Sequence, residues 1–229
     1  MGLTLTVANI HKSYSGKPIL KGCSFSFEDS GTYVLMGPNG SGKSTFFRIC
    51  ALLEDPDKGE VTYLSGGTPL QRSLELRRRI TLLLPRVGVF NASVFKNVAY
   101  GMKVRGSNGS EIHERVHDAL EFVGLARTKG QNALTLSSGE TQRLGIARAM
   151  VIQPEILFLD EPTASVDYQN VGIIEDILLK MKKEAKAILI VATHDMAQAK
   201  RLADQQLFLN DGRISLSGEA PFLFPCWLV

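Results

Sequence analysis

One stretch of the sequence combines residue types and a spacing that bind phosphate groups. It follows the pattern G-x-x-x-x-G-K-S and consists of Gly37, Pro38, Asn39, Gly40, Ser41, Gly42, Lys43, Ser44 and Thr45. An apolar run of strand length precedes this phosphate loop, and residues 46–53 can continue it as a helix. Glycines let successive backbone N–H groups converge on phosphate oxygens, and the helix start adds about half a positive charge. The context therefore predicts a nucleoside triphosphate site, in which Lys43 reaches the β- and γ-phosphates and Ser44 ligates Mg²⁺.

Other positions supply the remaining groups that phosphoryl transfer needs, namely a carboxylate for the metal and a group that activates water. The apolar run 156–159 ends in Asp160, the predicted Mg²⁺ carboxylate, and Glu161, the predicted general base. A second apolar run, 187–193, leads to His194. An isolated Asp-Glu pair can instead be a helix cap, and a lone histidine can be structural. Because the carboxyl ends of parallel strands meet at one sheet edge, we expect these groups to converge on the phosphate loop.

Composition narrows the class of protein. The chain has 229 residues, a length that fits one large domain or a domain with a sizeable insertion. Its 26 basic and 23 acidic residues give a net charge of +3, too small to indicate nucleic-acid binding. Cys23, Cys50 and Cys226 are far apart and form no C-x-x-C pair, which predicts buried thiols in a reducing compartment. No signal peptide or membrane span is recognisable, so we expect a cytoplasmic protein that reaches the membrane through a partner.

The elements that must position these groups follow an α/β order. Alternating apolar residues at 3–7 and 23–27 predict an antiparallel opening, with a loop at 11–18 between them. The apolar runs, including residues 80–84, predict strands buried in a mainly parallel sheet. Residues from about 87 to 150 are mostly helical in character, and Asp211-Gly212 predicts a late hairpin. The predicted fold is an α/β sheet domain interrupted by a helical subdomain.

Three further segments resemble motifs of one protein family. Residues 136–143 read LSSGETQR, residues 161–167 read EPTASVD and residues 192–195 read ATHD. They resemble the signature, the stretch from catalytic glutamate to D-loop, and the switch-histidine motif of ATP-binding subunits of ABC transporters. Tyr14 falls where that family has an aromatic residue stacking on adenine. The resemblance extends over essentially the full length of the chain.

The resemblance implies a fold, cofactors and a shared site. The fold is that of a P-loop NTPase with a RecA-like core in two parts, residues 1–86 and 149–229, around a helical signature subdomain, residues 87–148. Two subunits would sandwich two ATP molecules with Mg²⁺, and Glu161 and His194 would be catalytic. The signature residues Ser137, Ser138, Gly139 and Glu140, together with Asp167 of the D-loop, would complete the nucleotide site. Ser137 and Gly139, which open a helix expected from Thr141 onward, would contact the γ-phosphate that the other subunit's Lys43 holds.

The resemblance also implies partners in a membrane. The helical subdomain and the loop after Leu84 would dock against integral-membrane permease subunits, which in turn receive a substrate-binding protein. A free-standing subunit suggests an importer, located on the cytoplasmic face of the cell membrane. Residues 51–54, 89–94 and 192–195 look most like subunits that serve oxyanions such as tungstate or phosphate.

Two positions depart from the family pattern and leave alternatives open. Pro85 occupies the position of the Q-loop glutamine, which contacts Mg²⁺ and the attacking water, and proline offers no such side chain. Ser138 replaces the middle glycine of the signature, a change that is mild if the backbone is helical and costly at positive φ. One alternative is therefore a module that binds ATP and dimerises but hydrolyses weakly. Another is a soluble ABC protein of repair or translation. The apolar tail, residues 220–229, could pack on the sheet domain or contact a partner.

Overall fold

The structure is a computed structural model that describes residues 2–28, 31–164, 166–184 and 187–216. The apolar tail at 220–229 and Cys226 lie outside the described residues. Within these ranges, none of the helices has both the length and the apolar character needed to cross a membrane.

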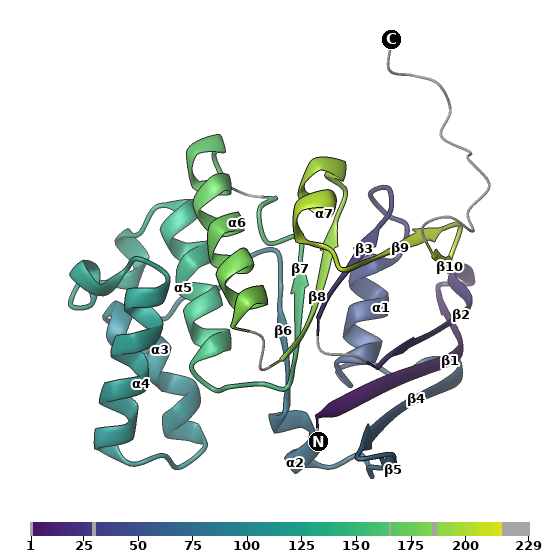
Figure 1. Ribbon diagram of the computed structural model, residues 1–229, viewed down its shortest axis with the longest axis horizontal. Coiled ribbons are helices and arrows are strands. Elements are labelled where there is room, and N and C mark those ends of the chain that lie inside the picture. The colour runs from purple at the N-terminus through teal and green to yellow at the C-terminus, as the bar shows by residue number, and fades with distance from the viewer. Residues whose placement is uncertain (1, 29–30, 165, 185–186, 217–229) are drawn as a thin grey trace.

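A six-stranded sheet forms the centre of the molecule (Figure 1). Its strand order is β10-β9-β3-β8-β7-β6. The strands are β3 (Thr32–Met36), β6 (Ile80–Leu83), β7 (Ile156–Asp160), β8 (Ile188–Thr193), β9 (Gln205–Asn210) and β10 (Arg213–Leu216). All neighbours pair in parallel except β10, which forms the expected antiparallel hairpin with β9 around Asp211-Gly212. The mainly parallel sheet predicted from the apolar runs is confirmed.

A second, antiparallel sheet of order β2-β1-β4-β5 comes from the first part of the chain. It contains β1 (Leu3–Tyr14), β2 (Lys17–Phe27), β4 (Lys58–Ser65) and β5 (Thr68–Pro69). The antiparallel opening is confirmed, but the loop predicted at 11–18 is wrong. There β1 and β2 continue to a two-residue turn at Ser15-Gly16, with φ of 49° and 78°. Positive φ at both positions makes a tight hairpin turn, so backbone pairing holds polar residues that lack an alternating pattern.

Helix α1 (Lys43–Cys50) lies between the two sheets (Figure 1). Along β3, Tyr33 and Leu35 pack in the same cluster as the buried side of α1, whereas Val34 and Met36 face a second cluster. A strand buried on both faces reads as a continuous apolar run, which is the pattern that predicted it.

Helices lie on the other face of the central sheet and beyond its β6 side (Figure 1). They are α3 (Val94–Val104), α4 (Gly109–Phe122), α5 (Ser138–Met150), α6 (Tyr168–Lys183) and α7 (Met196–Leu202), while the short α2 (Leu74–Arg78) precedes β6. Two 3₁₀ turns, Ala126–Thr128 and Ala133–Thr135, connect α4 to α5. Helices α3, α4 and α5 gather at the β6 side of the sheet, where α3 and α4 pack on α5, and α6 and α7 lie nearer its middle (Figure 1).

Candidate nucleotide-binding site

The central sheet brings the predicted catalytic groups to one edge. Strand β3 ends in the phosphate loop, β7 ends at Asp160, and β8 ends one residue before His194. Because β8 lies between β3 and β7, these three carboxyl ends are neighbours. A cavity of about 500 Å³ opens there, lined by residues of the phosphate loop and by Tyr14, Pro85, Glu161 and His194.

The phosphate loop is shaped by glycines at positions where other residues would be strained. Gly40 and Gly42 have φ of 80° and 107°, in the left-handed region. A Cβ on Gly42 would also lie 3.0 Å from the side chains of Ile19 and Leu20. Gly42 caps α1 without a side-chain hydrogen bond, so the first N–H groups of the helix remain available to an anion.

Within the loop, the Lys43 ammonium is already held in place. Its Nζ donates hydrogen bonds to the carbonyl oxygens of Gly37 (2.8 Å) and Pro38 (3.3 Å). It also lies 3.2 Å from Oε1 of Glu161. Asn39, Gly40, Ser44 and Thr45 line the cavity, while the Ser41 hydroxyl is buried behind it without a hydrogen-bond partner in the described chain.

Asp160 is buried, with 1% of its surface exposed. Neither carboxylate oxygen has a well-aligned hydrogen-bond partner among the described residues. Burial raises the pKa of the Asp160 carboxyl, although the nearby Ser44 hydroxyl acts in the opposite direction. Oxygen ligands of this kind, a carboxylate and a hydroxyl, suit Mg²⁺, which is bound by few protein groups and keeps several waters. The residues present therefore fit the expected metal.

Glu161 and His194 form a direct pair. Nδ1 of His194 lies 2.7 Å from Oε2 of Glu161, and both residues line the cavity. Glu161 has a φ of 49°, and its N–H donates to the carbonyl oxygen of Ala192. A non-glycine residue in this conformation is costly and is found where the surrounding structure enforces it, commonly at functional sites. The turn directs the Glu161 carboxylate back toward Lys43.

The signature residues lie elsewhere. Ser137 caps α5, with its Oγ accepting from the N–H of Glu140 (3.2 Å), and the Glu140 carboxylate accepts from the N–H of Ser137 (2.9 Å). The helix begins at Ser138, three residues before the expected Thr141, because this capping box, S-x-x-E, starts it. Ser138 is helical, so a side chain there needs no positive φ and the substitution for glycine is mild. Among the described residues that line the cavity, none belongs to the signature.

Asn170 joins the signature to Asp167, a role that sequence reasoning missed. Asp167 caps α6 and accepts hydrogen bonds from the N–H (3.1 Å) and the Nδ2 (2.8 Å) of Asn170. A Cβ on Gly139 would lie 2.3 Å from the Asn170 side chain, so the two helix starts are in close contact. The sequence offers the capping pair D-x-x-N at 167–170, but no signal for the contact with Gly139.

Pro85 lines the same cavity as the phosphate loop and Glu161, and its side chain supplies no polar atom. We expect Pro85→Gln to raise the ATP turnover of the isolated chain by up to about tenfold, equivalent to one well-placed hydrogen bond to metal or water. Steady-state phosphate release measures the turnover. Pro69→Gln, on the exposed strand β5, is the matched control. Equal turnover in both variants would show that this wall position does not approach the attacking water.

A family model described as "ABC transporter" matches residues 20–164 of the chain. The chain belongs to the ABC transporter family. This ABC subunit is 37% identical to the tungstate uptake system ATP-binding protein TupC of Peptoclostridium acidaminophilum, over 97% of the chain and all of the relative. It is 35% identical to the phosphate import ATP-binding protein PstB 2 of Natronomonas pharaonis, over 96% of the chain and 81% of the relative.

A solved structure of the same kind supports the fold. The structure of cbiO1 from Clostridium perfringens, part of the ABC transporter complex cbiONQ, superimposes with a TM-score of 0.82 and 31% sequence identity. The match covers 94% of this ABC subunit and 88% of cbiO1. The predicted P-loop NTPase fold is confirmed, as is the predicted function: the chain is an ATP-binding, ATP-hydrolysing subunit that works with membrane permease components.

Proposed function

We propose that this ATPase powers the import of an oxyanion, of the tungstate or phosphate class, through separate permease subunits. The names of the tungstate and phosphate relatives support the choice of cargo, as does a relative from Haloferax volcanii named a probable anion import ATP-binding protein. A substrate-binding protein would deliver the oxyanion to the permease. The chain would act on the cytoplasmic face of the cell membrane.

The signature lies away from the nucleotide cavity, and this position supports the proposal that two copies of the chain share each ATP. The chain's own cavity contains the phosphate loop, the pair of Glu161 and His194, and Tyr14, whose ring would stack on adenine, but the described residues around it include no signature residue. A helix start with a serine and a glycine is a suitable partner for a γ-phosphate. In a two-fold dimer, Ser137 and Gly139 of one copy would therefore close over the ATP bound to the other.

The ion pair between Lys43 and Glu161 suggests how hydrolysis begins. When a triphosphate enters the loop, its γ-phosphate replaces Glu161 as the partner of Lys43. Glu161 is then free to accept a proton from water as the water oxygen bonds to the γ-phosphorus and the bond from phosphorus to the β–γ bridging oxygen breaks. His194 would hold the Glu161 carboxylate in place. Mg²⁺, held by Ser44 and Asp160, would neutralise charge on the β- and γ-phosphates.

The helical part of the chain, residues 87–148, is proposed as a subdomain that docks on the permease, with residues 1–86 and 149–229 as the ATP-binding core. A groove of about 540 Å³ is lined by β6 and its following loop together with α3 and α5. Leu84, Phe90 and Tyr100 line it and are exposed, and the Arg148 guanidinium lies 5.2 Å from the Phe90 ring. Exposed apolar and aromatic side chains around a groove are typical of a protein interface.

Transport assays in liposomes test the proposal. The chain, its permease subunits and their binding protein are reconstituted, and ATP hydrolysis is compared with the binding protein loaded with tungstate, phosphate or glutamate. We expect stimulation by an oxyanion, which is lost with Lys43→Ala. Stimulation by glutamate alone would refute the oxyanion assignment and leave the ATPase function standing.

A further inference from the structure

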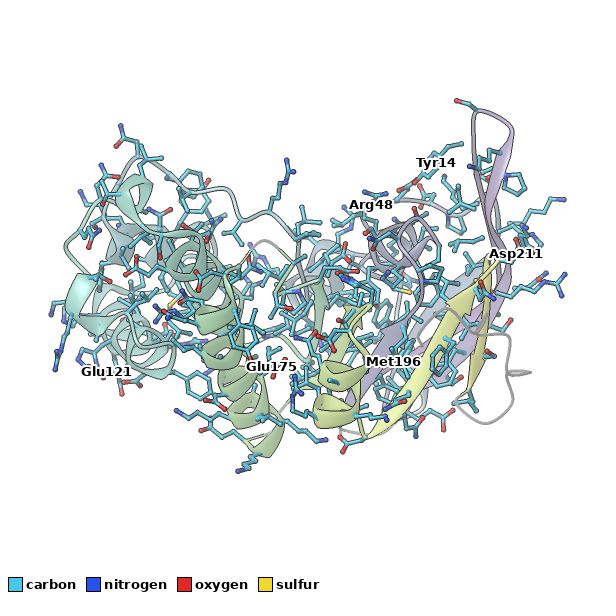
Figure 2. The ribbon with its side chains drawn as sticks, turned by 90° about the horizontal axis from the view of Figure 1, so that it is seen from above. Tyr14, Arg48, Glu121, Glu175, Met196 and Asp211 are labelled. Carbon is cyan, nitrogen blue, oxygen red and sulfur yellow. The ribbon has the colours of Figure 1, made fainter. Side chains whose placement is uncertain are left out.

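Tyr14, at the end of β1, is anchored by a contact that its motif does not account for. Its ring lines the nucleotide cavity, and 40% of the residue's surface is exposed. The Tyr14 hydroxyl donates a hydrogen bond of 2.5 Å to Oε1 of Glu54, in the loop that follows α1. In Figure 2 the labelled Tyr14 and Arg48 lie close together, on the same upper edge of the molecule. The exposed ring is thus held by its tip.

Two cationic side chains, one from β1 and one from α1, hold the Glu54 carboxylate in place. Lys12 Nζ of β1 lies 3.3 Å from its Oε1, and Arg48 Nε of α1 lies 3.3 Å from its Oε2. Burial alone would raise the pKa of Glu54, but the Tyr14 hydroxyl and Lys12 outweigh it and lower the pKa below its usual value. The carboxylate is therefore charged at neutral pH and acts as an acceptor for Tyr14.

The backbone around this contact is also held. The Asp57 carboxylate accepts from the N–H of Ser13 (2.7 Å), and the Asp57 N–H donates to the carbonyl oxygen of His11 (2.8 Å). Lys12 donates to the carbonyl oxygen of Asp55 (2.8 Å). With the end of β1 fixed to the loop after α1, the remaining freedom of Tyr14 is rotation of its side chain, and the Glu54 hydrogen bond restricts it.

We propose that Glu54 is a positioning residue for the nucleotide base, because it holds the Tyr14 ring in the orientation that stacks on adenine. This inference rests on the proposed role of Tyr14 as the base-stacking residue. Helix α1 carries the phosphate loop at its start, and the loop with Glu54 follows its end. One rigid helix therefore sets both the triphosphate position and the anchor of the ring, so that the ordering cost of the ring is met before ATP binds.

A double-mutant cycle on the full chain tests the contact, with Mg-ATP and Mg-tripolyphosphate affinities measured by calorimetry. We expect Tyr14→Phe, which keeps the ring, and Glu54→Ala each to weaken ATP binding by about 3- to 10-fold. The double variant should be no weaker than either single variant, because both remove the same hydrogen bond. Glu54→Gln should retain most of the affinity, since its amide oxygen still accepts from Tyr14. The affinity for tripolyphosphate, which has no base, should stay constant.

A control variant and further measurements separate positioning from a general structural effect. Asp55→Asn, in the same loop but paired with Arg72, should leave ATP affinity unchanged. In ATPase assays, the Glu54→Ala variant should show a raised KM with kcat retained. Losses in the double variant that simply add, or an equal loss of tripolyphosphate affinity, would overturn the inference. If Tyr14→Ala leaves ATP affinity unchanged, the stacking role in the proposed function fails. If Tyr14→Ala weakens binding and Glu54→Ala does not, the role of Glu54 alone fails.

Discussion

Glu161→Gln will bind Mg-ATP and hydrolyse it at least about 100-fold more slowly than the native chain, the lower range for removal of a general base. The amide keeps the size of the side chain and can still bond to His194, but it cannot take a proton from water. Phosphate release under saturating Mg-ATP measures the rate. Glu184→Gln, an exposed carboxylate at the end of α6, is the matched control and should retain the native rate.

The same variant should accumulate as an ATP-bound dimer in size-exclusion chromatography. Closure over the γ-phosphate persists when hydrolysis cannot release it, so the shift to a dimer should require Mg-ATP and disappear when Lys43→Ala is added. A monomer that binds ATP at every concentration would show that closure needs the permease. Native turnover in Glu161→Gln would remove Glu161 from the role of base.

Asp160→Asn is expected to raise the stability of the nucleotide-free chain while it abolishes Mg²⁺-dependent hydrolysis. Burial holds the pKa of Asp160 above its ordinary value, so folding favours the protonated form. The native chain therefore loses stability as the pH rises from about 4 through the folded-state pKa, and a neutral amide avoids that loss. At neutral pH each kcal/mol regained raises Tm by about 2–4 °C for a chain of this size.

Asp160→Asn should lower the ATPase activity of the chain, although it raises the stability of the nucleotide-free form. Without the carboxylate, Mg²⁺ would lose one of its two proposed protein ligands, and we expect the ATPase rate to fall by about 100-fold or more. Thermal unfolding with and without Mg-ATP measures both effects: the native chain gains stability with the ligand, and Asp160→Asn gains little. Asp176→Asn, on the exposed face of α6, controls for charge removal. A lower Tm in the apo variant, or retained activity, would contradict the assignment of Asp160.

Those parts of the site that consist of residues adjacent in sequence can be predicted from the sequence. The phosphate loop follows the apolar strand β3, Asp160 ends β7, and His194 follows β8 directly, so pattern and placement agree. The extended hairpin around Ser15 was missed because its polar strands are specified by pairing and turn geometry rather than by alternation. The start of α5 was placed too late, although the capping box was visible at 137–140.

Contacts between distant residues were out of reach of the pattern. The Tyr14–Glu54 hydrogen bond joins residues 40 positions apart, and the contact of Gly139 with Asn170 joins two helices that are separate in sequence. Such contacts depend on how β1, α1, α5 and α6 pack, and the residue type at either position does not predict which residue it contacts. The relative position of cavity and signature likewise follows from tertiary structure alone.

The close approach of Gly139 to Asn170 has a consequence for the kinetics of a dimer. Because Asn170 is bonded to Asp167 and contacts Gly139, the start of α5 and the start of α6 form a single packed joint within each chain. In a two-fold sandwich that joint would touch the nucleotide of the opposite copy, so filling one site would preset the geometry of the other. The rate of hydrolysis should then depend sigmoidally on ATP concentration, with a Hill coefficient above 1. The two sites of the dimer would act cooperatively rather than independently.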